Sequence, residues 1–168
     1  FVNNGILSGS VYGLLMDNDG QIGTLTNSGF ISGIQIRDGD LMFGGSPTII
    51  NVLNNLQGKS GSYALNYDGR VPNNYNIIIN STSDYGQIKF TNISSTTNFG
   101  VYSTSTIDTS ATYSSVIDGL TSAELNNTTT GTVTLSGSSY TWTLTDADSD
   151  FAWDLNFSRN GPSAADTQ

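Results

Sequence analysis

Four aspartates come closest, by residue type and spacing, to a catalytic or metal-binding pattern. Asp17 and Asp19 lie two residues apart, as do Asp38 and Asp40, and the second pair follows the first by 21 residues. If the chain coils with that period, all four carboxylates share one face, where they could bind Ca²⁺ or cleave a polysaccharide as paired acid and base. Asp beside Gly is also typical of solvated turns, which is the interpretation we favour here. Cation binding at these pairs stays open.

A second acidic run, at Asp146, Asp148 and Asp150, resembles the start of a calcium loop. Phe151 occupies its sixth position and Phe157 its twelfth, where such a loop needs Gly and Glu. We therefore expect a polar hairpin loop here and no metal site.

The residue inventory argues against enzymatic chemistry. The chain contains no His and no Cys, so it lacks the commonest general base, the commonest metal ligand and any thiol nucleophile. Lys59 and Lys89 stand in ordinary polar surroundings, and no Gly-rich loop has phosphate-binding spacing. We expect a non-enzymatic protein without a cofactor; a β-helical polysaccharide-degrading enzyme is the least favoured alternative.

Charge and composition narrow the class further. Among 168 residues, 14 are acidic and 5 basic, giving a net charge of −9, which excludes a basic footprint for nucleic acid. No apolar run approaches the length of a transmembrane helix. Helix-forming Glu and Lys are scarce while Gly and small polar residues abound, so an all-β fold is predicted.

Internal repeats indicate how the strands are arranged. Residues 3–9 align with residues 27–33 at an offset of 24, and residues 50–55 echo residues 22–27 at an offset of 28. Periods in the twenties with short strands are typical of a parallel β-helix, here expected to be right-handed. We expect an apolar interior formed by Ile6, Ile22, Leu25, Ile31, Leu53, Tyr75, Ile77, Ile79 and Ile88.

The last third of the chain reads differently. Residues 132–135 and 139–144 alternate around Gly137, as in a hairpin, and residues 151–157 continue the same period. Large apolar residues on these strands predict a cap that seals the coil; a carbohydrate-stacking platform is the alternative. The cap residues are Tyr140, Trp142, Leu144, Phe151, Trp153, Leu155 and Phe157.

Three features in this order resemble a known family. They are the repeats near the N-terminus, the segment Pro72-Asn73-Asn74-Tyr75-Asn76-Ile77-Ile78-Ile79, and the closing strands with both Trp residues. Together they resemble the C-terminal part of the passenger domain of a bacterial type V (classical) autotransporter, including its autochaperone region.

The resemblance implies an organisation and a function. Residues 1–62 would be β-helix rungs, residues 63–158 the last rungs and an autochaperone-like cap, and residues 159–168 the start of a linker toward an outer-membrane barrel that this chain lacks. Because the pattern starts in mid-repeat, we expect a piece of a longer protein. Such a passenger is anchored at the bacterial cell surface or secreted, and its cap nucleates folding outside the outer membrane. The alternative is an adhesin or glycan-binding surface, with a host-surface or glycan ligand as partner.

Overall fold

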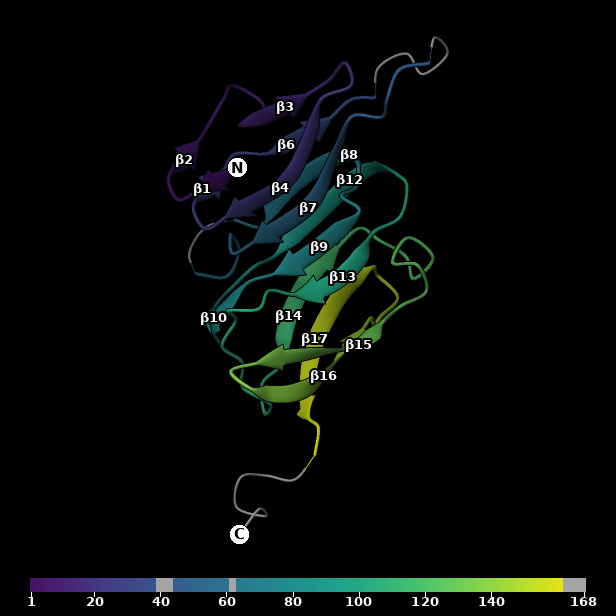
Figure 1. Cartoon of the computed structure of the whole chain (residues 1–168). Helices are drawn as coiled ribbons and strands as arrows, with labels where there is room; N and C mark the ends of the chain where they lie inside the picture. The colour runs from purple at the N-terminus through teal and green to yellow at the C-terminus, as the bar shows by residue number, and fades with distance from the viewer. Residues whose placement is uncertain (39–43, 61–62, 162–168) are drawn as a thin grey trace.

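The computed structural model describes residues 1–38, 44–60 and 63–161. These residues form an all-β solenoid of about four turns, without a helix in the part described. The turns pile along one axis from the N-terminal end to a set of long C-terminal strands (Figure 1). The expected parallel β-helix is confirmed.

Two sheets carry most of the coil. The five-stranded sheet is parallel throughout and runs in the order β1 (Val2–Asn3), β4 (Gln21–Asn27), β7 (Ile49–Asn55), β9 (Asn74–Ile77), β13 (Asn98–Val101). The eight-stranded sheet begins with five parallel strands, β3 (Leu14–Met16), β6 (Ile34–Ile36), β8 (Leu65–Arg70), β12 (Ile88–Ser94) and β14 (Tyr113–Asp118). It then continues in antiparallel pairing through β17 (Ala152–Arg159), β16 (Ser138–Thr145) and β15 (Thr130–Leu135).

Two short pairings complete the corners. Parallel strands β2 (Ile6–Leu7) and β5 (Phe30–Ile31) pair in the first two turns, and antiparallel strands β10 (Ile79–Ser81) and β11 (Asp84–Tyr85) pair in the fourth. Parallel pairing between β7 and β9 and between β6 and β8 crosses residue 62 without a break. The coil is therefore continuous across the boundary expected between rungs and cap region.

The strand register reproduces both repeat offsets. Asn3 pairs with Asn27 at an offset of 24, and Asn27 pairs with Asn55 at an offset of 28. These three side chains are buried and bonded in a ladder: the Asn3 amide donates to Asn27 Oδ1 at 2.9 Å, and the Asn27 amide to Asn55 Oδ1 at 3.1 Å. A buried amide needs such partners, so the ladder fixes the register of the first three turns.

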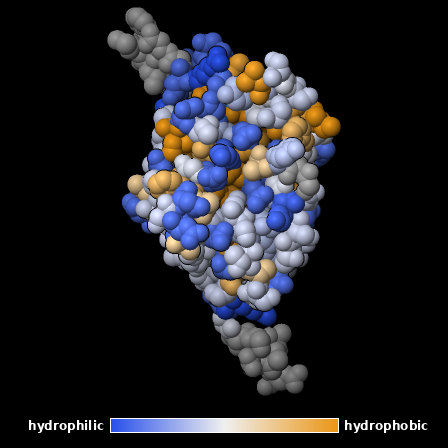
Figure 2. Space-filling view, turned by 180° about the vertical axis from the view of Figure 1, so that it is seen from behind, coloured by the Kyte–Doolittle hydropathy of each residue, from blue (hydrophilic) through white to orange (hydrophobic). Residues whose placement is uncertain are grey.

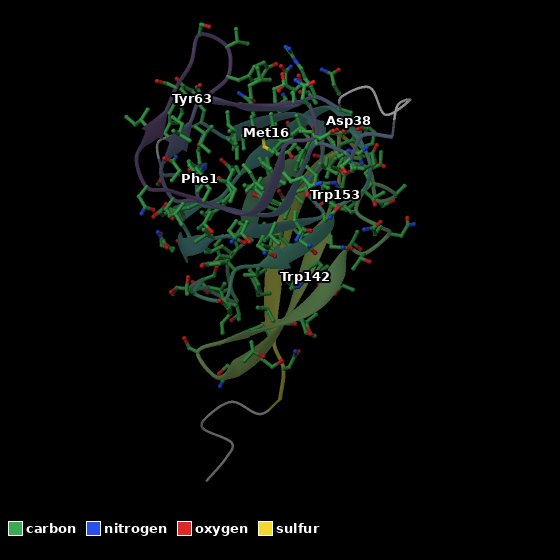
Figure 3. All side chains as sticks on the ribbon, turned by 45° about the horizontal axis from the view of Figure 1, so that its top comes forward. Phe1, Met16, Asp38, Tyr63, Trp142 and Trp153 are labelled. Carbon is green, nitrogen blue, oxygen red and sulfur yellow. The ribbon has the colours of Figure 1, made fainter. Side chains whose placement is uncertain are left out.

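The interior changes from aliphatic to aromatic along the axis. In the five-stranded sheet Leu25, Leu53, Tyr75 and Phe99 stack in register, and each is buried. Met16 lies within the first turn, whereas Trp142 lies toward the capped end (Figure 3). The larger residues fill the coil where it meets the cap.

Ile6 corrects the expected interior set. Its side chain is 75 % exposed, whereas its neighbour Leu7 packs against the core. The register explains the difference: Leu7 pairs with Ile31, which faces inward, so Ile6 opposite Phe30 must face outward. Ile22 is only partly buried. The remaining expected interior residues are fully buried or nearly so: Leu25, Ile31, Leu53, Tyr75, Ile77, Ile79 and Ile88.

Other apolar side chains of the first turn also reach the surface. Phe1, Val2, Val11 and Leu15 are each about half exposed or more. Apolar residues show in orange among hydrophilic ones toward the upper end of Figure 2, which is the N-terminal end of the coil.

Gln57 replaces a missing strand. Among the described residues no third-turn strand pairs with β5; instead the buried Gln57 side chain meets Ile31 there. Its Oε1 accepts the Ile31 N–H at 2.8 Å, and its Nε2 donates to the Ile31 carbonyl at 3.1 Å. The side-chain amide thus copies the two bonds that a neighbouring peptide group would supply.

Replacing Gln57 by Leu should therefore destabilise the coil by about 3 kcal/mol, because it leaves both Ile31 backbone groups buried without partners. Urea unfolding measures the loss. Gln21→Leu, at an exposed position of β4, is the control and should change stability by less than about 0.5 kcal/mol. Equal effects of the two substitutions would contradict the role given to Gln57.

Two buried tyrosines differ in one bond. The Tyr67 hydroxyl donates to the Arg70 carbonyl at 2.8 Å, while the Tyr75 hydroxyl is buried without a hydrogen-bond partner of good geometry in the described part of the chain. Burial raises the pKa of both side chains far above the usual value. Both hydroxyls therefore stay neutral at ordinary pH.

This difference predicts opposite effects of the same substitution. Tyr75→Phe removes an unsatisfied hydroxyl and should raise the free energy of unfolding by about 1 kcal/mol. Tyr67→Phe orphans a carbonyl and should lower it by about 1 kcal/mol. Thermal and urea unfolding of the two variants, measured side by side, check the sign; a loss in Tyr75→Phe equal to that in Tyr67→Phe would refute the assignment.

Candidate functional site

The candidate site is the C-terminal cap formed by β15, β16 and β17. Strand β17 runs antiparallel to β14, with Leu155 opposite Tyr113 and Trp153 opposite Ile117. Ser136 and Gly137 both have positive φ in the two-residue turn between β15 and β16, as a tight hairpin requires. The cap turns the strand direction of the eight-stranded sheet and so ends the parallel stacking (Figure 1).

Aromatic side chains join the cap to the coil. Trp142 meets Phe99 of the last turn edge to face, with ring centroids 5.0 Å apart, and Phe157 meets Tyr113 in the same way at 5.8 Å. Such pairs add to the free energy of simple area burial. Tyr140 is partly buried against the core. The buried cap residues are Trp142, Leu144, Trp153, Leu155 and Phe157.

Phe151 corrects the expected cap set. Its side chain is 47 % exposed and its φ is +67°, so it does not continue the alternation of β17, which begins at Ala152. The Asp146 carboxylate accepts the N–H groups of Asp150 and Phe151, and the Phe151 carbonyl accepts the Gly119 N–H. These bonds shape the loop before the strand and turn the Phe151 side chain outward.

Polar side chains of β17 bind an irregular stretch of β14. Ser115 has a φ of +50°, and the register between β14 and β17 shifts there. Asp154 Oδ1 accepts the Ser115 N–H at 2.8 Å, and Asn156 Nδ2 donates to Thr112 Oγ1 at 2.8 Å. Sequence reasoning missed these two residues, because nothing in the sequence marks the irregularity that they cover.

The segment between β14 and β15 closes the other side of the cap. Leu120 and Leu125 are fully buried, and the Trp153 indole N–H donates to the Leu120 carbonyl at 2.7 Å. The Asn126 amide donates to Asn98 Oδ1 at 2.8 Å, beside the start of β13. This segment thus ties the cap to the last strand of the five-stranded sheet as well.

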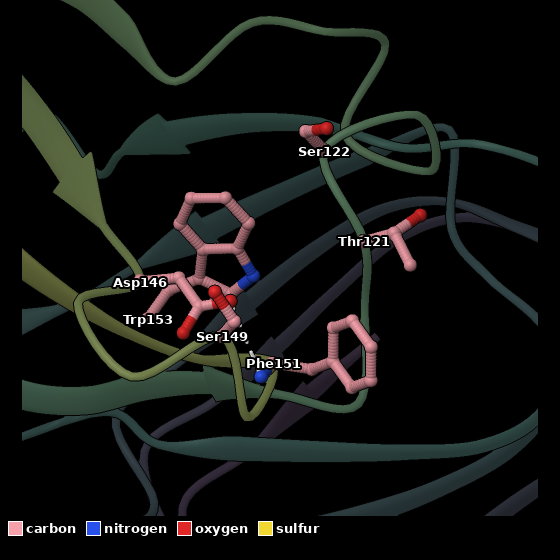
Figure 4. Close-up of a pocket in the computed structure, with 6 residues that line it drawn as sticks. All are labelled: Thr121, Ser122, Asp146, Ser149, Phe151 and Trp153. Carbon is pink, nitrogen blue, oxygen red and sulfur yellow. Dashed lines mark hydrogen bonds between the residues drawn. The ribbon is translucent and has the colours of Figure 1, made fainter.

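A cavity of about 240 Å³ lies beside the cap, with Trp153, Phe151, Asp146, Ser149, Thr121 and Ser122 around it (Figure 4). Its polar groups are largely engaged. The Asp146 carboxylate binds backbone N–H groups, the Thr121 hydroxyl donates to Glu124, and the Trp153 N–H is taken by Leu120. No activated nucleophile is found among these residues.

The paired aspartates do not assemble into a cluster in the described structure. Asp17 and Asp19 are exposed, and Asp38 pairs with Arg70 at 3.0 Å. Asp40 lies outside the described residues. Across residues 1–38, 44–60 and 63–161, no group of three or more possible metal-binding side chains occurs. The same ranges contain no helix of the length and apolarity needed to span a membrane.

The end of the chain also differs in detail from the expected boundaries. Strand β17 runs to Arg159, and the Asn160 side chain and backbone both bond to Ser139. Residues 159 and 160 therefore belong to the cap and not to a linker. Residues 162–168 lie outside the described structure.

Comparison of the chain with protein-family models, with curated proteins and with solved structures finds no match. Function must therefore be inferred from the geometry of the cap and the coil.

Gly131 offers a test of the cap packing. The Trp142 ring lies over it, so an added Cβ would come within 2.4 Å of Trp142 Cζ2. Gly131→Ala should displace the indole from Phe99 and destabilise the chain by about 2 kcal/mol, with a changed near-ultraviolet circular dichroism signal. Gly23→Ala, where no atom lies within 4 Å, is the matched control and should be neutral or slightly stabilising. The packing described here would be wrong if both variants kept wild-type stability.

Proposed function

We propose that this chain is a non-enzymatic passenger fragment of a self-secreting bacterial surface protein, whose cap nucleates folding of the β-helix outside the outer membrane. The observation that carries the proposal is the closed, aromatic-filled antiparallel cap on one end of an otherwise parallel coil. Its own outer-membrane barrel is the proposed partner, and the cell surface its location.

The physical argument concerns which part of the coil can fold first. Strands β15, β16 and β17 pair with near neighbours in sequence, so their contacts cost little loop entropy. The parallel strands instead pair across 22 to 33 residues. A cap that forms early offers the edge of β14 to the turn before it, and each added turn offers the next edge.

Folding of this kind would also give direction to secretion. A turn that has stacked outside the membrane must lose its buried apolar contacts and its backbone pairing before it can slip back. The stacked turns therefore oppose return of the chain, and no nucleotide-driven step is required in the argument.

A second candidate function, an adhesin or glycan-binding surface, is favoured by polar side-chain ladders on the coil. The Asn76 amide donates to Asn54 Oδ1 at 2.9 Å, and the Asn54 amide donates to Thr26 Oγ1 at 3.0 Å. The exposed Asn73 donates to Asn51 in the same manner. Such regular rows of amides suit a repetitive polar ligand.

Folding kinetics of two equivalent leucine variants test the proposed nucleus. Leu155 in the cap and Leu25 in the second turn are both fully buried, so Leu→Ala at either site should cost about 2–5 kcal/mol. Leu155→Ala should act mainly by slowing refolding, while Leu25→Ala should mainly speed unfolding. Leu155→Val provides the same measurement if the Ala variant does not fold.

The reverse assignment of rates, or equal partition in the two variants, would exclude the cap as nucleus. The secretion step has its own readout. In bacteria that produce the chain joined to an outer-membrane barrel, Leu155→Ala should reduce protease-resistant surface display more than Leu25→Ala. Unchanged display of the Leu155 variant would count against a role in secretion.

A further inference from the structure

A second and larger cavity lies at the end of the coil opposite the cap. It has a volume of about 370 Å³ and is bounded by Val11, Tyr12, Leu15, Gln35 and Arg37, together with the backbone of residues 9 and 10. That size is within the range of small-ligand sites. The proposed folding function assigns no role to these residues.

The outer face of the eight-stranded sheet forms the floor of this cavity. Leu15 of β3, Gln35 of β6 and Asp68 of β8 lie side by side in register, and they point away from the buried interior. The loop before β3 brings Tyr12 to the same row. Its hydroxyl donates to Asp68 Oδ2 at 3.1 Å.

Asp68 holds the row in place. Besides Tyr12, its carboxylate accepts bonds from Gln35 Nε2 at 2.8 Å and Asn92 Nδ2 at 2.8 Å, with Thr91 at 3.5 Å. Burial acts to raise the pKa of Asp68, but these four bonds outweigh it and lower the pKa below the usual value. The carboxylate is therefore charged at neutral pH and saturated by its own neighbours, so it orients Tyr12 and Gln35.

Two polar groups at the cavity are left over. Gln35 Oε1 is buried and has no hydrogen-bond partner among the described residues, although its Nε2 is fully used. Arg37 is exposed, and the described part of the chain shows no ion pair for it, whereas Arg70 pairs with Asp38. The cavity thus offers one unmet acceptor and one unpaired cation.

Apolar surface accompanies these groups. Val11 is 69 % and Leu15 49 % exposed, an unusual exposure for large aliphatic side chains beside a polar network. A ligand that fits must therefore combine a hydroxyl donor, a negative charge and an aliphatic face in one compact body. An aromatic acid offers no hydroxyl donors, and inorganic phosphate offers no apolar face.

We propose that this cavity binds an acidic sugar, a pyranose bearing a carboxylate. The carboxylate pairs with the Arg37 guanidinium, whose fork of N–H groups matches it. A ring hydroxyl donates to Gln35 Oε1, and the C–H face of the ring packs on Val11 and Leu15. The net charge of −9 repels long polyanions, so a single acidic sugar at a glycan end is the preferred ligand.

Two methyl glycosides that differ only at the carboxylate test the proposal. Methyl β-D-glucuronide should bind the wild-type chain saturably in calorimetric or NMR titration, about tenfold more tightly than methyl β-D-glucoside. Arg37→Gln should reduce the glucuronide affinity to the glucoside level. Arg159→Gln removes the same charge from the cap and should leave binding unchanged.

Tyr12→Phe separates the ordered row from the charge. It removes the hydroxyl bonds to Asp68 and Gln35, so both glycosides should bind several-fold more weakly while the preference for the glucuronide persists. Absence of saturable binding by either glycoside would overturn the proposal. So would equal affinity for the two, or equal losses in Arg37→Gln and Arg159→Gln. None of these outcomes bears on the folding role of the cap.

Discussion

The whole structure depends on one constraint: each turn must present its backbone N–H and C=O groups opposite those of the turn beneath it. Buried backbone groups without partners are costly, so a shift of register cannot be tolerated inside the coil. The buried Asn3–Asn27–Asn55 ladder repeats this demand with side chains. Where a strand is absent, Gln57 supplies the two missing bonds to Ile31. Apolar burial provides the stabilising energy, but the hydrogen-bond register decides the shape.

A parallel coil cannot end itself, because its last strand always exposes another edge. Here the chain solves the problem in the eight-stranded sheet by reversing strand direction at β17, and it covers β13 with the segment that contains Leu120 and Leu125. The change from aliphatic to aromatic interior belongs to the same solution. Large rings such as Trp142 span the distance from the cap to Phe99 of the last turn.

The repeat offsets predicted the parallel coil and its register, because strict stacking leaves a period in the sequence. They also contained the information that places Leu7 inward and Ile6 outward, since residue 6 aligns with Phe30. Phe151 was placed wrongly because its left-handed backbone breaks the alternation of the strand. The Asp68-Gly69 pair, typical of a tight turn, lies within β8; Gly69 is needed there because a Cβ would collide with the Ile36 carbonyl. Long-range polar groups such as Gln57 and Tyr12 carry no sequence period, so only the folded structure identifies their roles.

The spacing between bonded residues of successive turns varies, from 22 residues between Asn54 and Asn76 to 33 between Gln35 and Asp68. The strands nevertheless stay in register, so the corners absorb every difference in length. Corner loops are therefore the places where this scaffold accepts extra sequence, whether acquired by natural insertion or grafted as an epitope. A foreign peptide placed there would be displayed at a fixed height along a rigid rod.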